Sequence, residues 1–363
     1  MKKTLVALAV TAFAASAYAV PVFENDTTKV DFWGSVRVGF DNVSKDTKVS
    51  EYADAETKAK AGKKSGNTKL RNQGSRLGVN VNHQLGDGFY ALGGLQVRFD
   101  DVETRKKDDS RFGELHTRRA FVGLGKKEYG EITFGEQLTL ADNYGLATDM
   151  NLGFTPSYIT TEATSVAQYT YKGIDGLTLG ANYNFRQTHD ARGAALSNVV
   201  KNEYGVGALY QKDVADDQTL TLEGGYGRTN YETDAAYKHY RDGYEAAVGY
   251  RVGAVTLFSD FGYKYEKNDR AKTKSFYVAP GAQYQFNDKT RLYANYLYEN
   301  VDVVKGKETK THGVLAFVEH KLHKNVSVYL EGIVKKSKDY NVDGKFVSKS
   351  TDKGIATGLF VNW

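Results

Sequence analysis

The sequence predicts an all-β fold, a 16-stranded antiparallel transmembrane β-barrel, from three observations. Apolar and polar residues alternate with a period of two in one segment after another, as in a strand that separates an apolar surface from a polar one. Most of these segments have about ten residues, the length at which a tilted strand crosses a bilayer. The connections alternate between short and long, as in barrels with tight turns at one end and larger loops at the other.

Sixteen segments carry the alternation, an even number as bacterial barrels have. Segment 30–41 is typical, because Val36 and Phe40 share one face while Arg37 lies on the other. The predicted strands are 30–41, 76–85, 89–101, 117–126, 130–137, 164–172, 177–187, 203–212, 218–229, 244–252, 254–265, 275–286, 290–300, 312–322, 326–335 and 354–363.

The connections predict which strand ends lie together. With sixteen antiparallel strands, both termini lie on the side of the short turns. The predicted short connections are 86–88, 127–129, 173–176, 213–217, 253, 287–289 and 323–325, and the long ones are 42–75, 102–116, 138–163, 188–202, 230–243, 266–274, 301–311 and 336–353.

The last segment, GIATGLFVNW at 354–363, ends the chain on an apolar aromatic residue. Ile355, Leu359 and Trp363 lie on one face, which either another chain or lipid must cover. Chain ends fray unless they are held in place, so we expect this strand to pair with the first one. Trp363 would then close the barrel and leave no open edge.

Composition supports many paired strands. The chain has 26 Tyr, 18 Phe and 37 Gly but only 3 Pro, and proline removes a donor from a strand ladder. The mean hydropathy of −0.53 fits alternating strands, which window averages do not detect. The formal charge of +5 is too small and too dispersed to indicate nucleic acid. The absence of cysteine excludes thiol catalysis and cysteine-ligated zinc.

The first nineteen residues are predicted to be a secretory signal peptide. Lys2 and Lys3 precede an apolar run from Leu5 to Ala15, and a small-x-small cleavage box ends at Ala19. We therefore expect two regions, a signal peptide at 1–19 and a barrel domain at 20–363.

Alternation alone also fits a soluble β-sandwich. Sixteen ten-residue strands in one chain exceed an ordinary sandwich, and aromatic pairs near the strand ends indicate the interfacial girdles of a membrane barrel. The pairs are Tyr244 and Tyr250, Tyr263 and Tyr265, Tyr284 and Phe286, and Tyr296 and Tyr298.

The chemistry of an enzyme is not indicated. The seven histidines are scattered, and His320 and His323 cannot share a strand face at their odd spacing. The stretch AGKKSG at 61–66 lacks the first glycine of a phosphate loop. We expect no enzymatic activity, no metal and no cofactor.

Pro280 lies inside a predicted strand, where a missing N–H is rarely tolerated. We expect either a local bulge or a register in which that position faces no partner.

With these features in place, the chain resembles the general diffusion porins of Gram-negative outer membranes, especially the Pasteurellaceae-type major porins. The resemblance extends over the whole mature chain and depends on the order and spacing of several stretches. They are TKVDFWGSVRVGF at 28–40, RNQGSRLGVNVNHQLGDGFYALGGLQVRF at 71–99, TRRAFVGLGKKEYGEITFGEQ at 117–137, YKGIDGLTLGANY at 171–183 and the terminal aromatic strand.

The resemblance implies an outer-membrane channel for passive diffusion of ions and small hydrophilic solutes. It also implies a homotrimer, contact with outer-membrane lipid and lipopolysaccharide, assembly by the barrel assembly machinery, and a third loop folded inward as a constriction, here 138–163. The family usually ends on Phe, so Trp363 departs from it.

The same resemblance implies which residues line the constriction. The TDM stretch of the third loop matches the family's acid at Asp149, whereas the position of its second acid is Gly153. Asp142 or Glu162 could substitute for that second acid.

On the opposite wall, the family places basic side chains that Arg76 and Arg118 match, and Arg37 points inward by alternation two positions from the family's lysine. The family arginine that follows an FG pair is Glu136 here.

Opposed charges would impose a transverse field across the constriction. Two unit charges roughly 10 Å apart in water interact by only about 0.4 kcal/mol, so we expect weak, cumulative selectivity. The further inward cations expected are Arg98, Arg186, Arg251, Arg291 and Lys264, and the inward acids are Asp100, Glu223, Asp260 and Glu331.

Two alternatives remain open from the sequence. One is a substrate-specific channel, for which an aromatic slide or an extra basic ladder would be expected. The other is a surface adhesin that uses the charged loops of a barrel scaffold.

Overall fold

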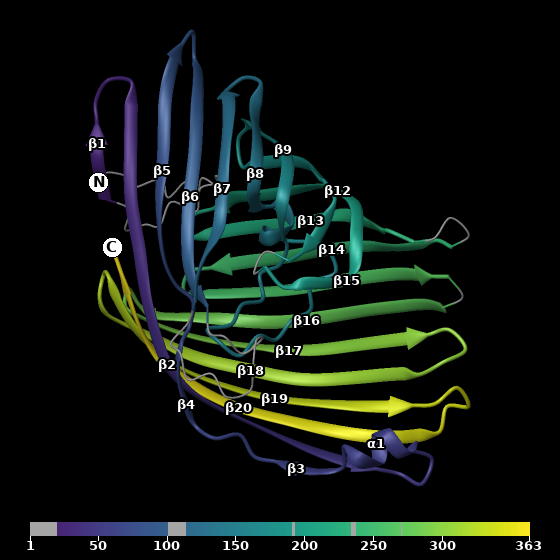
Figure 1. Ribbon diagram of the computed structural model, residues 1–363. Coiled ribbons are helices and arrows are strands. Elements are labelled where there is room, and N and C mark those ends of the chain that lie inside the picture. Colours follow the sequence, from purple (N-terminus) through teal and green to yellow (C-terminus); the bar gives the residue numbers. More distant parts are fainter. Residues whose placement is uncertain (1–19, 101–113, 191–192, 234–236, 270) are drawn as a thin grey trace.

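A computed structural model describes residues 20–100, 114–190, 193–233, 237–269 and 271–363. In these residues sixteen long strands pair antiparallel in chain order and close into a barrel (Figure 1). No helix in these residues has the length and apolar character needed to cross a membrane. The barrel strands are β2 (Thr28–Val49), β5 (Ser75–Gly86), β6 (Phe89–Asp100), β7 (Glu114–Lys126), β8 (Gly130–Leu138), β9 (Glu162–Ile174), β10 (Leu177–Asn184), β12 (Ala195–Ala215), β13 (Gln218–Tyr231), β14 (His239–Val252), β15 (Val255–Asn268), β16 (Ala271–Asn287), β17 (Thr290–Val303), β18 (Glu308–His323), β19 (Val326–Tyr340) and β20 (Phe346–Asn362).

Shorter elements extend this frame. β3 and β4 pair with β2 in the connection that leads from β2 to β5, and β11 pairs with β12. The elements are β1 (Val20–Glu24), α1 (Ala55–Ala59), β3 (Gly62–Lys64), β4 (Lys69–Asn72), the 3-10 helix η1 (Leu140–Asn143) and β11 (Gln187–His189).

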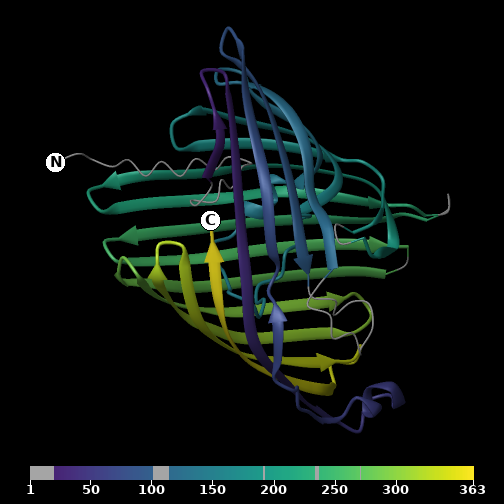
Figure 2. The same cartoon turned by 60° about the vertical axis from the view of Figure 1, so that its left-hand side comes forward.

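The seam between β2 and β20 closes the barrel. The two strands pair from Ser35 opposite Asn362 to Val49 opposite Ser348, while the first part of β2 pairs with β5. Trp363 exchanges two backbone hydrogen bonds with Gly34, at 2.9 and 3.0 Å. Figure 2 shows the C-terminal end of β20, in yellow, beside β2 in purple.

β1 continues the line of β20 along the same edge of β2. Val20 lies opposite Phe32, two residues before the position at which Trp363 pairs. β1 and β20 together therefore cover the edge of β2, and the chain end is held by backbone hydrogen bonds.

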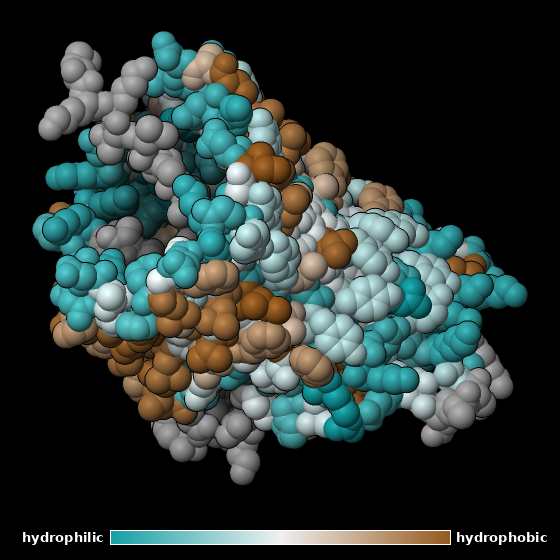
Figure 3. Space-filling model, turned by 90° about the horizontal axis from the view of Figure 1, so that it is seen from above, coloured by the Kyte–Doolittle hydropathy of each residue, from teal (hydrophilic) through white to brown (hydrophobic). Residues whose placement is uncertain are grey.

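The two faces of the barrel have different side chains. In β20, Ile355 is 55% exposed and Leu359 43% exposed, whereas Ala356 and Phe360 are buried on the inner face. Figure 3 shows apolar side chains and pale aromatic rings over much of one side of the molecule, with hydrophilic side chains toward its ends. The exposed aromatic residues include members of the predicted girdles, namely Tyr244, Tyr250, Tyr263, Tyr284, Phe286 and Tyr296.

Several strands are longer than the ten residues that the alternation predicts. β2 has 22 residues and β12 has 21, and β13 and β14 extend to Tyr231 and back from His239 where a long loop was expected. These predicted boundaries were wrong at the long-loop end, because backbone pairing continues past the apolar band with polar side chains. The opposite ends turn tightly, as predicted.

Pro280 occupies a gap in one ladder without a bulge. It lies opposite Ser259 in an unbroken register with β15. On the β17 side, pairing is present at Val278 and again at Gly281 in the same register, but is missing between them. The position without an N–H therefore faces an interruption of the ladder, the second of the two expected arrangements.

Candidate functional site

The connection between β8 and β9 runs along the inner wall, and Glu331 of β19 holds its middle. The Glu331 carboxylate accepts hydrogen bonds from the backbone N–H groups of Met150, Asn151 and Leu152, at 2.6, 3.0 and 2.8 Å. Glu331 is 1% exposed, whereas its neighbour Leu330 is 50% exposed on the other face. The connection thus contacts the face of the sheet opposite to the exposed apolar side chains.

Three other wall carboxylates bind the same connection. Asp260 of β15 accepts the N–H groups of Leu146 and Ala147, at 2.9 and 2.8 Å. Neighbouring strands add two further acceptors, which are Glu223 of β13 for Gly145 at 3.1 Å and Glu245 of β14 for Tyr158 at 2.5 Å. Carboxylates spread over four strands therefore satisfy backbone donors of a segment that has no sheet partner.

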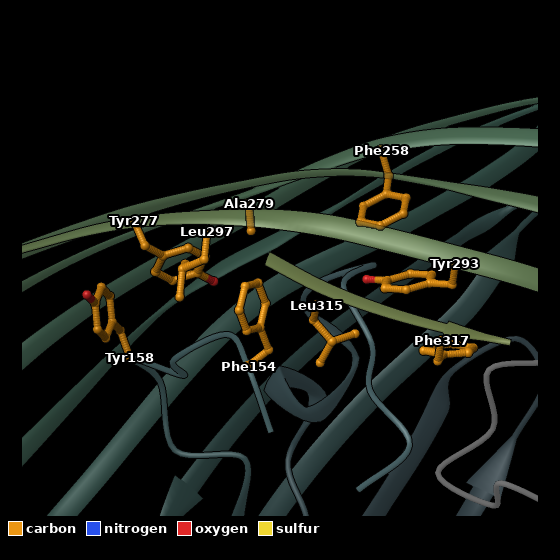
Figure 4. Close-up of a cluster of buried hydrophobic side chains, with 9 residues drawn as sticks. All are labelled: Phe154, Tyr158, Phe258, Tyr277, Ala279, Tyr293, Leu297, Leu315 and Phe317. Atoms are coloured by element: carbon orange, nitrogen blue, oxygen red, sulfur yellow. The ribbon is translucent and has the colours of Figure 1, made fainter. Parts of the chain in front are cut away.

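Aromatic packing adds an apolar attachment. Phe154 and Tyr158 reach from the connection to side chains of the wall, and the Tyr158 and Tyr277 rings lie edge to face with centroids 5.2 Å apart (Figure 4). At the base of the connection, Thr139 and Thr161 are joined by a backbone hydrogen bond of 2.9 Å. Figure 4 labels the cluster of Phe154, Tyr158, Phe258, Tyr277, Ala279, Tyr293, Leu297, Leu315 and Phe317.

Basic side chains gather on the wall formed by β2, β5, β6 and β7. Arg76 of β5 lies opposite Ser35 of β2 on one side and opposite Arg98 of β6 on the other. Four further guanidinium groups lie within electrostatic reach of Arg76, those of Arg37, Arg98, Arg118 and Arg119. The predicted residues Arg37, Arg76 and Arg118 thus belong to one group of five.

A β-bulge places two consecutive arginines in this group. Gln96 pairs with Arg119 and Val97 with Thr117, so Arg118 is the extra residue of β7. Strict alternation would put only one of two neighbours inside, and a bulge re-aims a side chain. Arg119 is therefore a lumen residue that sequence reasoning missed, and the TRRA stretch contains no signal for the bulge.

The closing seam positions Arg37. Its Nε donates to the Ser35 hydroxyl at 2.9 Å, and that hydroxyl donates to Asn362 at 2.7 Å. Its guanidinium carbon lies 4.9 Å from the centre of the Phe360 ring. The side chain is thus fixed from both β2 and β20.

A recess of about 450 Å³ lies between the basic wall of β2, β5, β6 and β7 and the middle of the connection between β8 and β9. Arg37, Arg76 and Arg119 line it together with Asp149 and Met150. The structure therefore brings together three of the four residues predicted for the constriction. The recess is also lined by residues of β17, β18, the turn after β18 and β19, namely Arg291, Glu319, Lys321, Lys324, Val326 and Ser327.

The acids of the connection are perturbed by their surroundings. The protein atoms around Asp149 raise the pKa of its carboxyl above the usual value, although the residue has an exposed surface. A hydrogen bond from the Gly153 N–H partly offsets this increase. The protein atoms around Asp142 likewise raise the pKa of its carboxyl, although this residue too has an exposed surface, and the nearby Arg119 charge opposes the increase. Gly153 has a φ of 59°, so the position where the family has its second acid is a left-handed turn here.

The fourth predicted residue, Arg118, forms an ion pair with Glu162 at the start of β9. Because of this pair, Glu162 neutralises a basic residue of the wall. A second ion pair, between Arg291 and Glu319 at 2.6 Å, lies inside the recess.

Other predicted cations lie elsewhere. Arg186 is outside the strands and pairs with Glu232 at 2.5 Å, with 57% of its side chain exposed. Arg251 donates to Thr219 at 2.7 Å near the short turns. Lys264 lies over the Tyr158 ring, 5.1 Å from its centre.

The expected balance of inward acids needs correction. Glu223, Asp260 and Glu331 do lie on the inner wall, but their carboxylates face the N–H groups of the connection instead of open lumen. The side chain of Asp100 lies outside the described residues. Among those residues, no group of three or more His, Cys, Asp or Glu could hold a metal ion.

Comparisons with known proteins agree with this architecture. The chain is 28% identical over 355 residues to the major outer membrane protein of Pasteurella multocida, covering 94% of this chain and 95% of that protein. Its fold is similar to a trimer form of OmpT from Vibrio cholerae, with a TM-score of 0.67, 20% identity and coverage of 93% and 100%. It is also similar to the anion-selective porin from Comamonas acidovorans, with a TM-score of 0.64, 18% identity and coverage of 93% and 100%.

A closed barrel with an apolar outer face and a charged interior defines the class of β-barrel membrane channels. Residues 4–340 match the family described as Gram-negative porin, and the chain belongs to that family. It is an outer-membrane channel for passive diffusion.

Proposed function

We propose that ions and small hydrophilic solutes pass through the recess between the arginine wall and Asp149, and that this passage weakly favours anions. The observation that carries the proposal is the charge of the lining. Of the described residues around the recess, six are basic (Arg37, Arg76, Arg119, Arg291, Lys321 and Lys324) and two are acidic (Asp149 and Glu319).

Acids elsewhere on the inner wall do not cancel this excess at the recess. Glu223, Asp260 and Glu331 direct their oxygens at backbone N–H groups of the connection, which stabilise negative charge locally. Glu162 is paired with Arg118. Passing ions would therefore meet mainly the positive potential of the arginine wall.

The preference should be modest. A unit charge about 8 Å from a passing ion contributes only about 0.5 kcal/mol in water, so no single group binds a solute. Several like charges add up to a bias without a trap, which suits a diffusion channel.

The proposal extends to the assembly. OmpT of Vibrio cholerae is described in a trimer form, and we expect a homotrimer for this chain too. We also expect removal of residues 1–19, insertion by the barrel assembly machinery, contact with outer-membrane lipid and lipopolysaccharide, and no enzymatic activity. A substrate-specific channel would show saturating transport of one solute class, and a surface adhesin would not conduct.

Reversal potentials test the proposed selectivity. The purified protein is inserted into planar bilayers that separate two KCl concentrations, and the double variant Arg76→Gln, Arg119→Gln is compared with wild type. Removing two positive charges should raise the energy of chloride by about 1 kcal/mol and lower that of potassium by as much, so the chloride-to-potassium permeability ratio should fall by about 30-fold before salt screening reduces the effect. The control Arg186→Gln removes a charge outside the recess and should leave the ratio unchanged.

An unchanged ratio in the double variant would refute the assignment of the path to this recess. A wild-type channel that prefers potassium would refute the proposed anion preference while leaving the channel function intact.

A further inference from the structure

A second group of basic and aromatic side chains lies on the outer face of the barrel, across β12 to β15. Cross-strand pairing arranges it in rows. One row contains Asn202, Asn230, Tyr240 and Lys267, and the row beside it contains Tyr204, Arg228, Asp242 and Tyr265.

The next row toward the middle of the strands shows which face this is. It contains Val206, Tyr226, Tyr244 and Tyr263, of which Val206, Tyr244 and Tyr263 are 54%, 48% and 41% exposed. Centroids of the Tyr226 and Tyr244 rings lie 5.0 Å apart. A continuous aromatic row on the apolar face is typical of the interface between hydrocarbon and headgroups.

The basic rows therefore lie on the far side of this aromatic row, toward the long loops. Since the Tyr226, Tyr244 and Tyr263 row marks the interface between hydrocarbon and water, the two polar rows next to it lie at the level of the lipid headgroups. Because the termini and short turns are at the opposite end, these rows belong to the end that carries the long loops.

A recess of about 530 Å³ opens among these rows. Lys201, Arg228, Lys238 and Lys267 line it, together with Tyr240 and the side-chain amides of Asn202 and Asn230. No acidic residue is among the described residues that line it. The recess thus presents cations and neutral hydrogen-bonding groups to one bound group.

Its central cation is held in place. Arg228 lies over the Tyr240 ring, with the guanidinium carbon 4.0 Å from the ring centre. Its Nε donates to Asn230 at 3.2 Å, and Nη1 lies 3.2 Å from Asp242. A stacked and hydrogen-bonded guanidinium loses little freedom on binding an anion.

Nearby acids are engaged elsewhere. Asp242 pairs with Arg228 from the side of the aromatic row and also accepts the Tyr226 hydroxyl at 2.7 Å. Glu232 pairs with Arg186, although its charge also reaches Lys201. Glu266 bonds to His239 at 2.9 Å. The lysines of the recess thus provide the net positive charge.

We propose that this recess binds the phosphate of an anionic membrane lipid in the outer leaflet. The proposal rests on the barrel spanning the outer membrane, and it is independent of the path that ions take inside. Lysine and arginine at headgroup level bind phosphate by charge and by N–H donors, and the exposed aromatic row below would contact the acyl chains. A membrane lipid is favoured over a soluble anion because the recess opens on the outer face and adjoins the apolar surface.

Lipid retention by the full-length barrel tests the site. Wild type and the double variant Lys201→Gln, Lys267→Gln are purified in neutral detergent, mixed with phosphatidylglycerol or phosphatidylcholine, and examined by native mass spectrometry. Wild type should retain phosphatidylglycerol in preference, and the double variant should lose about tenfold or more in that preference. The control Lys212→Gln, Lys289→Gln removes the same charge near the short turns and should behave as wild type.

Two results would overturn the proposal. One is an unchanged preference in the double variant when heat-dependent gel migration shows that it is folded. The other is complete displacement of phosphatidylglycerol by excess inorganic phosphate, which would mark a site for soluble anions. Single-channel conductance should be the same in all three proteins, so a loss of conductance would concern the channel and not the lipid site.

Discussion

Replacing Glu331 by alanine should release the middle of the connection between β8 and β9 from the barrel wall. Three backbone N–H groups, those of Met150, Asn151 and Leu152, donate to this one buried carboxylate at 2.6–3.0 Å. Alanine removes the acceptor and leaves the donors without a partner. The sheet itself should persist, because the ladders of β19 with β18 and β20 use backbone groups.

The size of the effect follows from those three contacts. A hydrogen bond to a charged group contributes about 1.5–3 kcal/mol, and contributions at one site are not fully additive. A total of about 3–6 kcal/mol corresponds to a change of at least about 100-fold in the fraction of time that these residues are detached. Glu331→Gln keeps a carbonyl acceptor and should have an intermediate effect.

Hydrogen exchange measures this detachment directly. The amides of residues 150–152 should exchange at least about 100-fold faster in Glu331→Ala, and single-channel recordings should show more frequent conductance fluctuations. Glu319→Gln is the matched control, because Glu319 is an inner carboxylate that pairs with Arg291 and not with the connection. Equal protection of these amides in Glu331→Ala and wild type would refute the reasoning.

Two further predictions concern charge and closure. The pKa values of Asp142 and Asp149 are raised, so acidification below neutral pH should neutralise these two carboxylates before ordinary carboxyls, which titrate near about 4. The loss of negative charge should increase the chloride preference measured by reversal potential. The double variant Asp142→Asn, Asp149→Asn should lack this increase, and a shift of the wild-type channel toward potassium on acidification would contradict the prediction. Gly34→Ala should lower the temperature at which the barrel unfolds, as measured by heat-dependent gel migration, because its Cβ would overlap the Trp363 ring. Gly332→Ala is the control, since its Cβ would lie 4.0 Å from the nearest atom, and equal unfolding temperatures for the two variants would contradict the role assigned to the seam.

The alternation of side chains predicted the barrel together with the number and length of the segments and the aromatic pairs near their ends. A strand that separates lipid from a water-filled interior needs one continuous apolar face, so Ile355, Leu359 and Val361 on one face of the last strand already indicate the side that meets lipid. The pairing of β2 with β20 followed from the need to leave no edge. Strand ends toward the long loops could not be predicted, because backbone pairing there continues with polar residues on both faces.

The site was predicted only in part, for local reasons. Arg37, Arg76 and Asp149 line one recess, and their role in a constriction stays a prediction. Arg119 was missed because a single extra residue in β7 changes the side to which its neighbours point. The role of Glu331 was also missed, since the hydrogen bonds to a segment 180 residues away leave no periodic signal in the sequence.

Single-channel recording of the purified wild-type protein in planar bilayers tests the central claim, that alternate side chains from β2 to β20 separate lipid from a conducting interior. The structure predicts discrete openings whose current is proportional to voltage. A polypeptide that remains dissolved without detergent and leaves the bilayer silent would contradict it.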